Sequence, residues 1–441
     1  DSDQANTDRA GQGMVNVSTN FFTLNRKWSW TKEAPTAIDL FSGAGGITLG
    51  LLNADFNVRL CSDLKAACAA THRRNFPTVP FIHGDICDLT SRQIMKSAGV
   101  KRGELDLLIG GPPCQGFSIL GQRALDDPRN QLFVEFLRVA KDLQPKSVVI
   151  ENVPGLATLA KGAFLREIAD AFDSAGYDVE AAELLAAQYG VPQMRWRMVF
   201  IGWRRDLKRR GGFPAPTHGT AGIGDLVPNR TIPATATKGF VTIREAIGDL
   251  PPVAAGEVRE DYVARPKGPF QRAMRAGTRE LANHYAPKMS KQNLERIRAL
   301  KPGQDWRDLP NSLLPPGMQR ALGKDHTRRY RRMEWHGVAR SIITRFRDPK
   351  SGEYTHPDQD RTISIREAAR IQTFPDWFVF EGSYTDHYEQ VGNAVPVLMA
   401  RAVGREIAAM LRGGEGQCAP VKARYRVREE PKVPFDLVAA E

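Results

Sequence analysis

The sequence predicts an α/β protein with a doubly wound sheet and a smaller, irregular second domain. Short apolar runs alternate with helical stretches between residues 37 and 202, a βαβα order that favours parallel strands and right-handed crossovers. Several of these runs are continuously apolar, as in strands that are covered on both faces. From about residue 206 to 345 the apolar runs become short, and Pro and Gly are frequent. This change marks the second domain.

Each element follows from this alternation. Strands are expected, in chain order, at 37–41, 58–62, 80–84, 105–110, 147–151 and 197–202. Helices are expected between them at 64–75, 130–143 and 163–175, and after the irregular region at 364–374 and 394–412. Ligands of doubly wound sheets bind at the carboxyl ends of the strands, so functional residues should follow each strand directly.

Length and composition set the outer limits. The 441 residues are 41% hydrophobic and 25% charged, which excludes a fibrous, disordered or membrane-embedded chain. We expect the divisions 1–34 (polar extension), 35–205, 206–345, 346–412 and 413–441 (tail). No apolar run reaches the roughly 20 residues that span a bilayer, and no secretory signal opens the chain. Five cysteines without CxxC spacing favour a cytoplasmic protein without a disulfide framework or bound metal.

Positive charge is concentrated in one segment. The whole chain carries +12, whereas residues 203–350 hold 30 Lys and Arg against 14 Asp and Glu, a net charge of +16. A segment of this kind can neutralise several phosphates and release their counterions. One arginine cluster alone would be better explained as a solvated surface. The offset of the whole segment favours a nucleic-acid partner.

A glycine-rich loop, FSGAGG at 41–46, follows the first strand. Its glycines would let a ligand approach the backbone, although a purely structural turn explains the loop equally well. Thr48 stands where the dinucleotide fingerprint GxGxxG requires its last Gly, which disfavours a pyrophosphate cofactor. Asp63 and Asp85 follow the next two strands, where they could accept from ribose hydroxyls and an adenine amino group. Either could equally cap a helix.

A cysteine and a glutamate follow two neighbouring strands. Cys114 lies in a loop stiffened by two prolines, and Glu151 ends the next strand 37 residues later, the length of one crossover. A thiolate is a nucleophile, and the pocket must assist its ionisation. A buried free cysteine and a capping glutamate are the alternative. Their place at matched strand ends favours a reactive site.

Six segments in this order resemble the motifs of the DNA (cytosine-5) methyltransferases. They are DLFSGAGG (39–46), GPPCQGFS (111–118), ENVPG (151–155), QYGVPQMRWR (188–197), REAARIQTFPD (366–376) and GNAVP (392–396). The resemblance covers about residues 35–412. It implies a Rossmann-like methyltransferase sheet, S-adenosylmethionine as cofactor, and double-stranded DNA as partner. It also implies that 206–345 is a target-recognition domain and that 346–412 returns to the catalytic domain.

The resemblance assigns roles at the reacting base. Cys114 would add to C6 of cytosine so that C5 can accept a methyl group, and Glu151 would hydrogen-bond N3 and the exocyclic amine. Arg197 would face O2 and Arg195 the cysteine loop, since alternate residues of a strand share a side. Further substrate contacts are expected from Pro112, Gln115, Ser118 and Asn152. The segment 116–129 resembles the loop that closes over a flipped base.

The resemblance also assigns a cofactor site. Phe41 would stack on adenine, Asp63 would hold the ribose, and Asn393 would reach the cofactor from the C-terminal segment. The methionine end would be admitted by Ser42, Gly43, Gly45 and Gly46, and the adenine framed by Asp85 and Ile86. Two positions depart from the family pattern: Asp63 replaces a longer Glu, and Val397 replaces a Pro.

Three rival functions are weighed against this one. Transfer RNA is the nearest alternative substrate, but the roughly 140 residues at 206–345 exceed the reduced recognition region of that branch. A catalytically silent DNA-binding relative would not need Cys114, and Thr48 disfavours a nicotinamide oxidoreductase. The compact organisation favours a bacterial modification enzyme with a companion restriction or defence protein.

Overall fold

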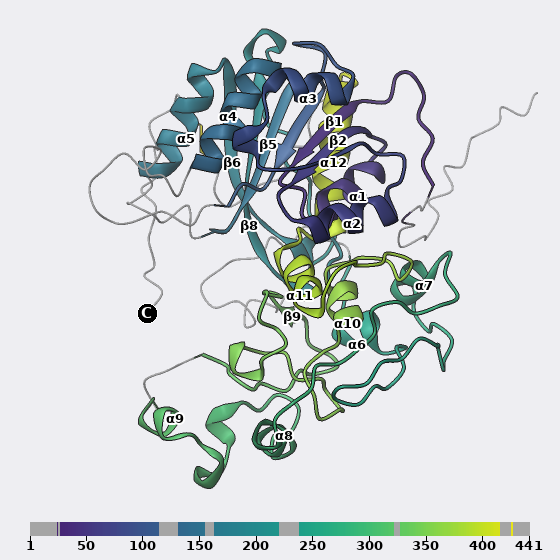
Figure 1. Cartoon of the computed structure of the whole chain (residues 1–441). Helices are drawn as coiled ribbons and strands as arrows, with labels where there is room; N and C mark the ends of the chain where they lie inside the picture. The colour runs from purple at the N-terminus through teal and green to yellow at the C-terminus, as the bar shows by residue number, and fades with distance from the viewer. Residues whose placement is uncertain are drawn as a thin grey trace, which may run out of the picture.

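The computed structural model describes residues 24, 27–113, 131–154, 163–219, 238–321, 327–414 and 425–426. The chain forms two lobes, one above the other in Figure 1. The sheet lobe comprises residues 36–204 together with 397–411, and the second lobe comprises the described residues of 238–393.

The sheet lobe is built on eight strands in the order β10-β6-β8-β5-β4-β1-β2-β3. Their bounds are β1 Thr36–Leu40, β2 Asn57–Asp63, β3 Phe81–His83, β4 Leu107–Gly110, β5 Ser147–Asn152, β6 Tyr177–Leu185, β8 Trp196–Arg204 and β10 Tyr425–Arg426. Strands β1 to β5 pair in parallel. The strand order reverses between β1 and β4, which is where doubly wound sheets bind their ligands. The predicted fold class is confirmed.

Two features of the sheet differ from the sequence prediction. The strand expected at 197–202 is antiparallel to both of its neighbours, β5 and β6, so the sheet is not wholly parallel. Strand β6 itself was not predicted. Its segment YDVEAAELL is rich in Ala and Glu, which favour helices, and its nine-residue pairing with β8 overrides that local preference.

Helices cover both faces of the sheet, which explains the continuously apolar strands. Their bounds are α1 Gly46–Leu52, α2 Ala66–Asn75, α3 Ser91–Ala98, α4 Gln131–Leu143, α5 Ala163–Ser174 and α12 Val397–Leu411. One hydrophobic core contains residues of α1 and α12, and a second contains residues of α3, α4 and α5. Along β1, Ala37 belongs to the first core and Ile38 to the second. Helix α3 was not predicted. The helices expected at 64–75, 130–143, 163–175 and 394–412 correspond to α2, α4, α5 and α12, with small differences at their ends.

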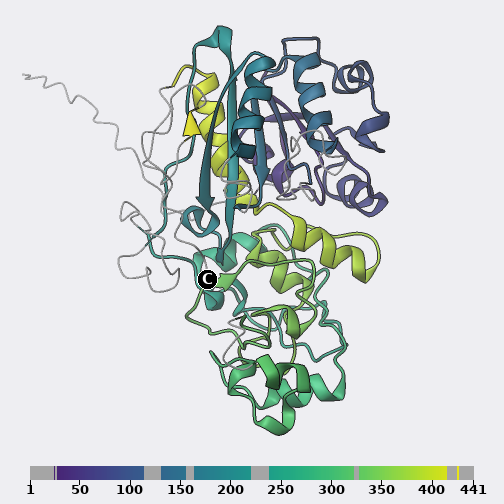
Figure 2. The ribbon, with the colours of Figure 1, turned by 90° about the vertical axis from the view of Figure 1, so that its left-hand side faces the viewer.

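Helix α12 returns the C-terminal segment to the sheet lobe, where it runs along the strands (Figure 2). It approaches α1 closely because glycines lie at the crossing. A Cβ atom on Gly50 would lie 2.6 Å from the Cβ of Ala400, and one on Gly404 would lie 2.9 Å from the Cβ of Ala54.

The second lobe consists of short elements joined by long loops. They are α6 Ile243–Ile247, α7 Pro269–Arg275, α8 Lys291–Arg298, α9 Pro316–Ala321, α10 Ile365–Ile371, α11 Tyr384–Asn393 and the strand β9 Ala339–Arg340. Strand β9 pairs in parallel with β7, Gln193–Met194, directly before β8. This pairing fastens the second lobe to the end of the sheet.

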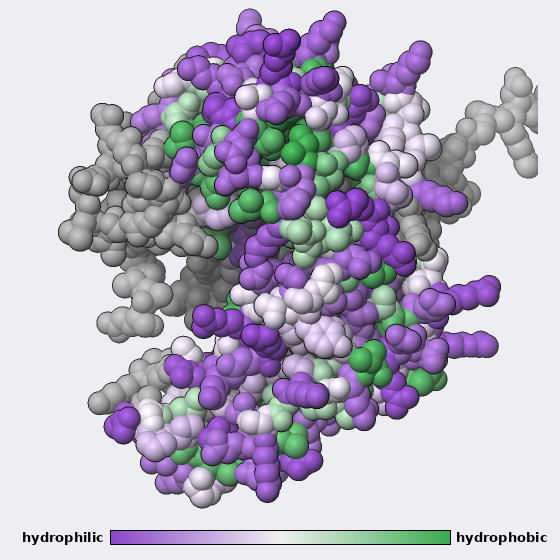
Figure 3. Space-filling model, viewed as in Figure 1, coloured by the Kyte–Doolittle hydropathy of each residue, from purple (hydrophilic) through white to green (hydrophobic). Residues whose placement is uncertain are grey.

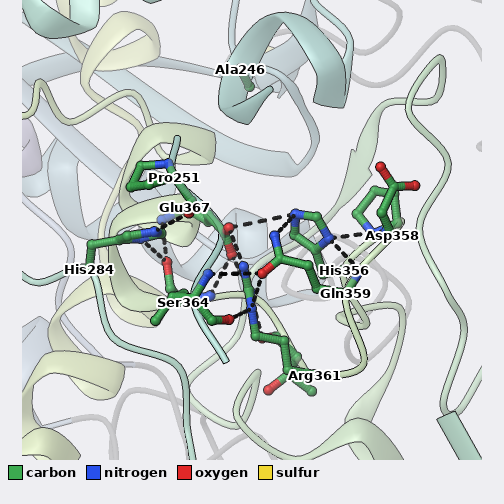
Figure 4. Close-up of polar contacts among 12 residues, drawn as sticks. Ala246, Pro251, His284, His356, Asp358, Gln359, Arg361, Ser364 and Glu367 are labelled. Carbon is green, nitrogen blue, oxygen red and sulfur yellow. Dashed lines mark hydrogen bonds and ion pairs between the residues drawn. The ribbon is translucent and has the colours of Figure 1, made fainter. Parts of the chain in front are cut away.

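A buried polar network fixes α10 inside the second lobe (Figure 4). Arg361 donates to both oxygens of Glu367 at 2.7 Å, and both side chains are 1% exposed. Ser364 caps α10 by accepting from the Glu367 backbone N–H, and its hydroxyl also contacts His284. The Nδ1 atom of His356 accepts two backbone N–H groups, and its Nε2 lies 3.7 Å from Glu367. The irregular backbone of this lobe is therefore held by directed polar contacts.

The face of the molecule shown in Figure 3 is mostly hydrophilic, and its outline is indented between the two lobes. Within the described residues, no helix has the length and apolar character needed to cross a membrane.

Candidate active site

A cavity of about 720 Å³ opens at the carboxyl ends of β1, β2, β4 and β5 and continues to the second lobe. The predicted site residues that line it are Phe41, Ser42, Gly43, Gly46, Asp63, Asp85, Ile86, Pro112, Glu151, Asn152, Arg195, Arg197 and Asn393. The predicted residues Cys114, Gln115 and Ser118, and the segment 116–129, lie outside the described residues. Pro113, the chain neighbour of Cys114, lines the cavity.

The glycine loop between β1 and α1 has a left-handed backbone at several positions. The φ angles are 56° at Phe41, 53° at Gly43 and 95° at Gly45. Gly45 does not line the cavity. A Cβ there would lie 2.6 Å from the Phe76 ring, so the lack of a side chain at this position lets that ring pack against the loop. A Cβ on Gly46 would lie 2.2 Å from the carbonyl oxygen of Val395. The loop and the GNAVP segment therefore meet backbone to backbone.

Two of the acidic residues that follow strands also shape the backbone around the cavity. Asp63 accepts from the backbone N–H of Gly43 and of Lys65, each at 2.9 Å. Asp85 caps a 3₁₀ helix by accepting from the Cys87 N–H at 2.9 Å. Asp63 and Asp85 thus bond to nearby backbone N–H groups and also line the cavity, because a carboxylate has two oxygens and several acceptor positions.

Asp39, beneath the glycine loop, is fully buried. Its Oδ2 accepts from the hydroxyl of Thr48 at 2.6 Å. Burial raises the pKa of Asp39 to about 7. Thr48, which stands where the dinucleotide fingerprint requires a Gly, therefore donates a hydrogen bond to a buried carboxyl group.

An ion pair lies at the end of β5. The Nε atom of Arg197 is 2.6 Å from Oε1 of Glu151, and both side chains are largely buried, at 12% and 14% exposed. The other carboxylate oxygen, Oε2, lies on the side of Gly111, where an added Cβ would be 3.2 Å from it. The carboxyl group is therefore held in one orientation, next to the loop that leads to Cys114.

Asn152 connects the two strand ends. Its Nδ2 donates to the carbonyl oxygen of Pro112 at 3.1 Å, and its Oδ1 accepts from the N–H of Val153 at 2.8 Å. These bonds fix the backbone two residues before Cys114 against the end of β5. The side chain thus orders the turn.

Arg195 lines the same cavity, and the loop with Cys114 that it is expected to face lies outside the described residues. Its guanidinium donates to the carbonyls of Ile342, Gly392 and Ala394 at 2.6, 3.2 and 3.2 Å. Burial, and then the charge of Arg197, lowers the pKa of Arg195 to about 9, so it remains protonated at neutral pH. Arg195 joins β7 and β8 to two distant segments of the cavity wall.

Several lining residues were missed from the sequence. They are residues 341–344 after β9, the α11 residues Asp386, Glu389 and Gln390, and Leu64 with Lys65 after β2. Lys65 forms an ion pair with Glu389, 324 positions away. The sequence signal for Leu64 was its place as an apolar residue directly after a strand, and the structure shows its side chain 62% exposed. For residues 341–344 and for Asp386, Glu389 and Gln390 no periodicity or motif marked the contribution.

A doubly wound sheet with a glycine loop, strand-end carboxylates and a cavity at its switch point defines a Rossmann-like protein that binds a ligand at the carboxyl ends of its strands. The family model described as C-5 cytosine-specific DNA methylase matches residues 36–409. The chain belongs to this family of DNA (cytosine-5) methyltransferases, and S-adenosylmethionine is its methyl donor.

Similar proteins agree with this assignment. The type II methyltransferase M1.HphI of Haemophilus parahaemolyticus is 36% identical over 85% of this chain and 87% of its own. M.AgeI of Thalassovita gelatinovora is 31% identical over 84% of this chain and 98% of its own. A solved structure described as a DNA modification methyltransferase encoded within a prophage (E. coli) is 26% identical, with a TM-score of 0.64 over 86% of this chain and 99% of its own.

Proposed function

We propose that the protein is a sequence-specific, type II DNA methyltransferase that methylates C5 of a flipped-out cytosine through a covalent bond between Cys114 and C6. The observation that carries the proposal is the convergence of the Glu151–Arg197 pair and the Asn152-held loop on the cavity that also holds the glycine loop. The relatives named above are type II methyltransferases, which supports a companion restriction protein.

The cavity fits S-adenosylmethionine. Phe41, Leu64 and Ile86 offer apolar surface for an adenine ring, and Asp63 and Asp85 offer carboxylate oxygens. The close contact between Gly46 and Val395 brings Asn393 to the same cavity. When bound, the cofactor supplies an electrophilic methyl group.

The residues of this chain would prepare the cytosine for that methyl group. The thiolate of Cys114 forms an S–C6 bond, and the C5–C6 π electrons become available at C5. The carboxyl group of Glu151, held by Arg197, shares one proton with N3 and accepts a hydrogen bond from the exocyclic amine, and so stabilises the charge that develops on the ring. After C5 carries the methyl group, its proton passes to solvent. The S–C6 electron pair then leaves with Cys114, and the C5–C6 double bond is restored.

A base inside a duplex hides C6, so the target must leave the stack at a cost of a few kcal/mol. We assign the segment 116–129 to closure over the extruded base. The domain 206–345 is assigned to target recognition, with its surplus of positive charge attracting the phosphates.

Transfer of tritiated methyl groups from S-adenosylmethionine tests the proposal, with duplex DNA, transfer RNA and no nucleic acid compared. We expect label in duplex DNA alone, and label in RNA but not DNA would overturn the substrate. Cys114→Ala should abolish turnover. Duplexes with 5-fluorocytosine at the mapped target should form an irreversible adduct with the native protein, because fluorine at C5 cannot leave as the proton does. Turnover by the variant, or absence of the adduct, would refute the covalent step.

A further inference from the structure

Three arginines of the second lobe surround a single carboxylate, outside the active-site cavity. Arg340 and Arg331 approach Glu353 through their Nε atoms at 3.3 and 3.2 Å, and an Nη of Arg328 lies 3.7 Å away. All four residues line a second, smaller cavity of about 60 Å³. Glu334 lines the same cavity and pairs with Arg331, so three guanidinium groups face two carboxylates, and this group of three arginines with Glu353, the arginine cluster, keeps surplus positive charge.

The arginines of the cluster are not equivalent. Arg331 is 19% exposed and also contacts the carbonyl of Gly303 and, at 2.8 Å, the carboxylate of Glu334, so it is fixed in place. The side chains of Arg328 and Arg340 are 41% and 34% exposed. Within the described part of the chain, Glu353 is the only side-chain partner of either. Arg331 therefore braces Glu353, and Glu353 orients two guanidinium groups that keep donors for a ligand.

The arginine cluster lies beside the active-site cavity. Arg340 pairs with Met194 across β9 and β7, and both line the small cavity. The next residue along each strand, Ser341 and Arg195, lines the active-site cavity. Adjacent residues of these two segments therefore line the two cavities, which share this part of their wall.

We propose that Arg328 and Arg340, oriented by Glu353, read guanine next to the target cytosine and so determine sequence choice. This inference rests on the proposed function. A guanidinium fork matches the O6 and N7 acceptors of guanine in the major groove. Phosphate is the competing ligand. Glu353 lies between the arginines and lowers their net positive charge, which weakens the attraction of a phosphate and does not oppose a neutral base. Glu353 is thus a positioning residue for specificity.

The test uses the full-length enzyme and duplexes with randomised bases around one cytosine, read by bisulfite sequencing. Arg340→Lys and Arg328→Lys keep the charge and remove the planar fork. We expect each substitution to reduce the preference for guanine at one position about tenfold or more. This preference is the methylation rate with guanine divided by the rate with the other bases. The KM for S-adenosylmethionine should not change. Glu353→Gln should lower the preference for guanine at the same positions. A purely structural role of Glu353 would not change the base preference.

Arg298→Lys is the matched control, because Arg298 lies in the same lobe, is 60% exposed and has one ion pair, with Asp360 at 3.3 Å. Its base preference should equal that of the native enzyme. Native enzyme should also lose rate when 7-deazaguanine, which lacks N7, replaces guanine at the read position, whereas Arg340→Lys or Arg328→Lys should not. Unchanged base preference in both arginine variants overturns the inference, whether or not DNA affinity falls. If native enzyme methylates no DNA, the proposed function itself fails.

Discussion

At the residue scale, the chemistry that we propose depends on the orientation of one carboxyl group. Arg197 holds Oε1 of Glu151 at 2.6 Å, and Asn152 ties the preceding loop to the same strand end. A group aimed in advance at developing charge needs no reorganisation during the reaction. Sequence reasoning singled out Glu151 because it ends a strand. It could not foresee the three carbonyl partners of Arg195, which lie 147 to 199 positions away.

Glu151→Gln should lower kcat about 10²- to 10³-fold, the usual loss when one preorganised electrostatic group is removed. The affinity for S-adenosylmethionine should be nearly unchanged, since the proposed cofactor contacts lie elsewhere in the cavity. Steady-state methylation and calorimetric titration measure the two quantities. Glu295→Gln, an exposed site on α8, is the control. A variant with native kcat would remove Glu151 from the mechanism.

At the element scale, the contact between α1 and α12 carries the C-terminal segment to the cavity. The glycines at this crossing let two helix backbones approach each other, and Val395 and Asn393 lie just before α12 begins. The sequence analysis predicted a helix over 394–412, and the structure has it at Val397–Leu411, after Pro396. Which helix face meets α1 was not predictable from the amphipathic pattern, because both helices are largely buried.

Gly50→Ala tests this crossing. A Cβ at position 50 would lie 2.7 Å from the backbone N of Arg401, which no side-chain rotation can relieve. We expect a loss of about 1–3 kcal/mol in unfolding free energy from overpacking, opposite in sign to the usual gain for Gly→Ala within a helix. Gly317→Ala in α9, where an added Cβ would meet no described atom within 4 Å, should not destabilise the protein. Equal urea midpoints for native protein and Gly50→Ala would contradict the close crossing.

At the scale of the whole molecule, directed polar contacts hold together a lobe with little regular structure. Burial opposes ionisation of Glu367, but the ion pair with Arg361 outweighs it and keeps the pKa of Glu367 below its usual value. Burial lowers the pKa of His356 to about 4. Two backbone N–H groups point at its Nδ1, which a second ring proton would have to displace.

The free energy of unfolding should therefore decrease as the pH is lowered from neutral. A histidine whose pKa is lower in the folded state binds its proton preferentially in the unfolded state, so its contribution is complete above pH 6.5 and lost toward pH 4. Urea unfolding at pH 7.0, 6.0 and 5.0 should show a steady decline in unfolding free energy. His356→Gln should make that decline shallower, and His336→Gln, at an exposed position, should leave it unchanged. A native profile that is flat over this range would refute the assignment.

The sequence by itself determined the sheet core, the glycine loop, the carboxylates at strand ends and the family, because these depend on local patterns and on motifs of consecutive residues. Tertiary structure alone decided that β6 is a strand and that β8 runs antiparallel. It also decided that residues 341–344 and the α11 residues Asp386, Glu389 and Gln390 complete the cavity. It also decided which arginines meet Glu353. These features arise from packing between segments far apart in the chain, where the partner of a residue is set by the geometry of the assembled lobes and leaves no period or spacing in the sequence.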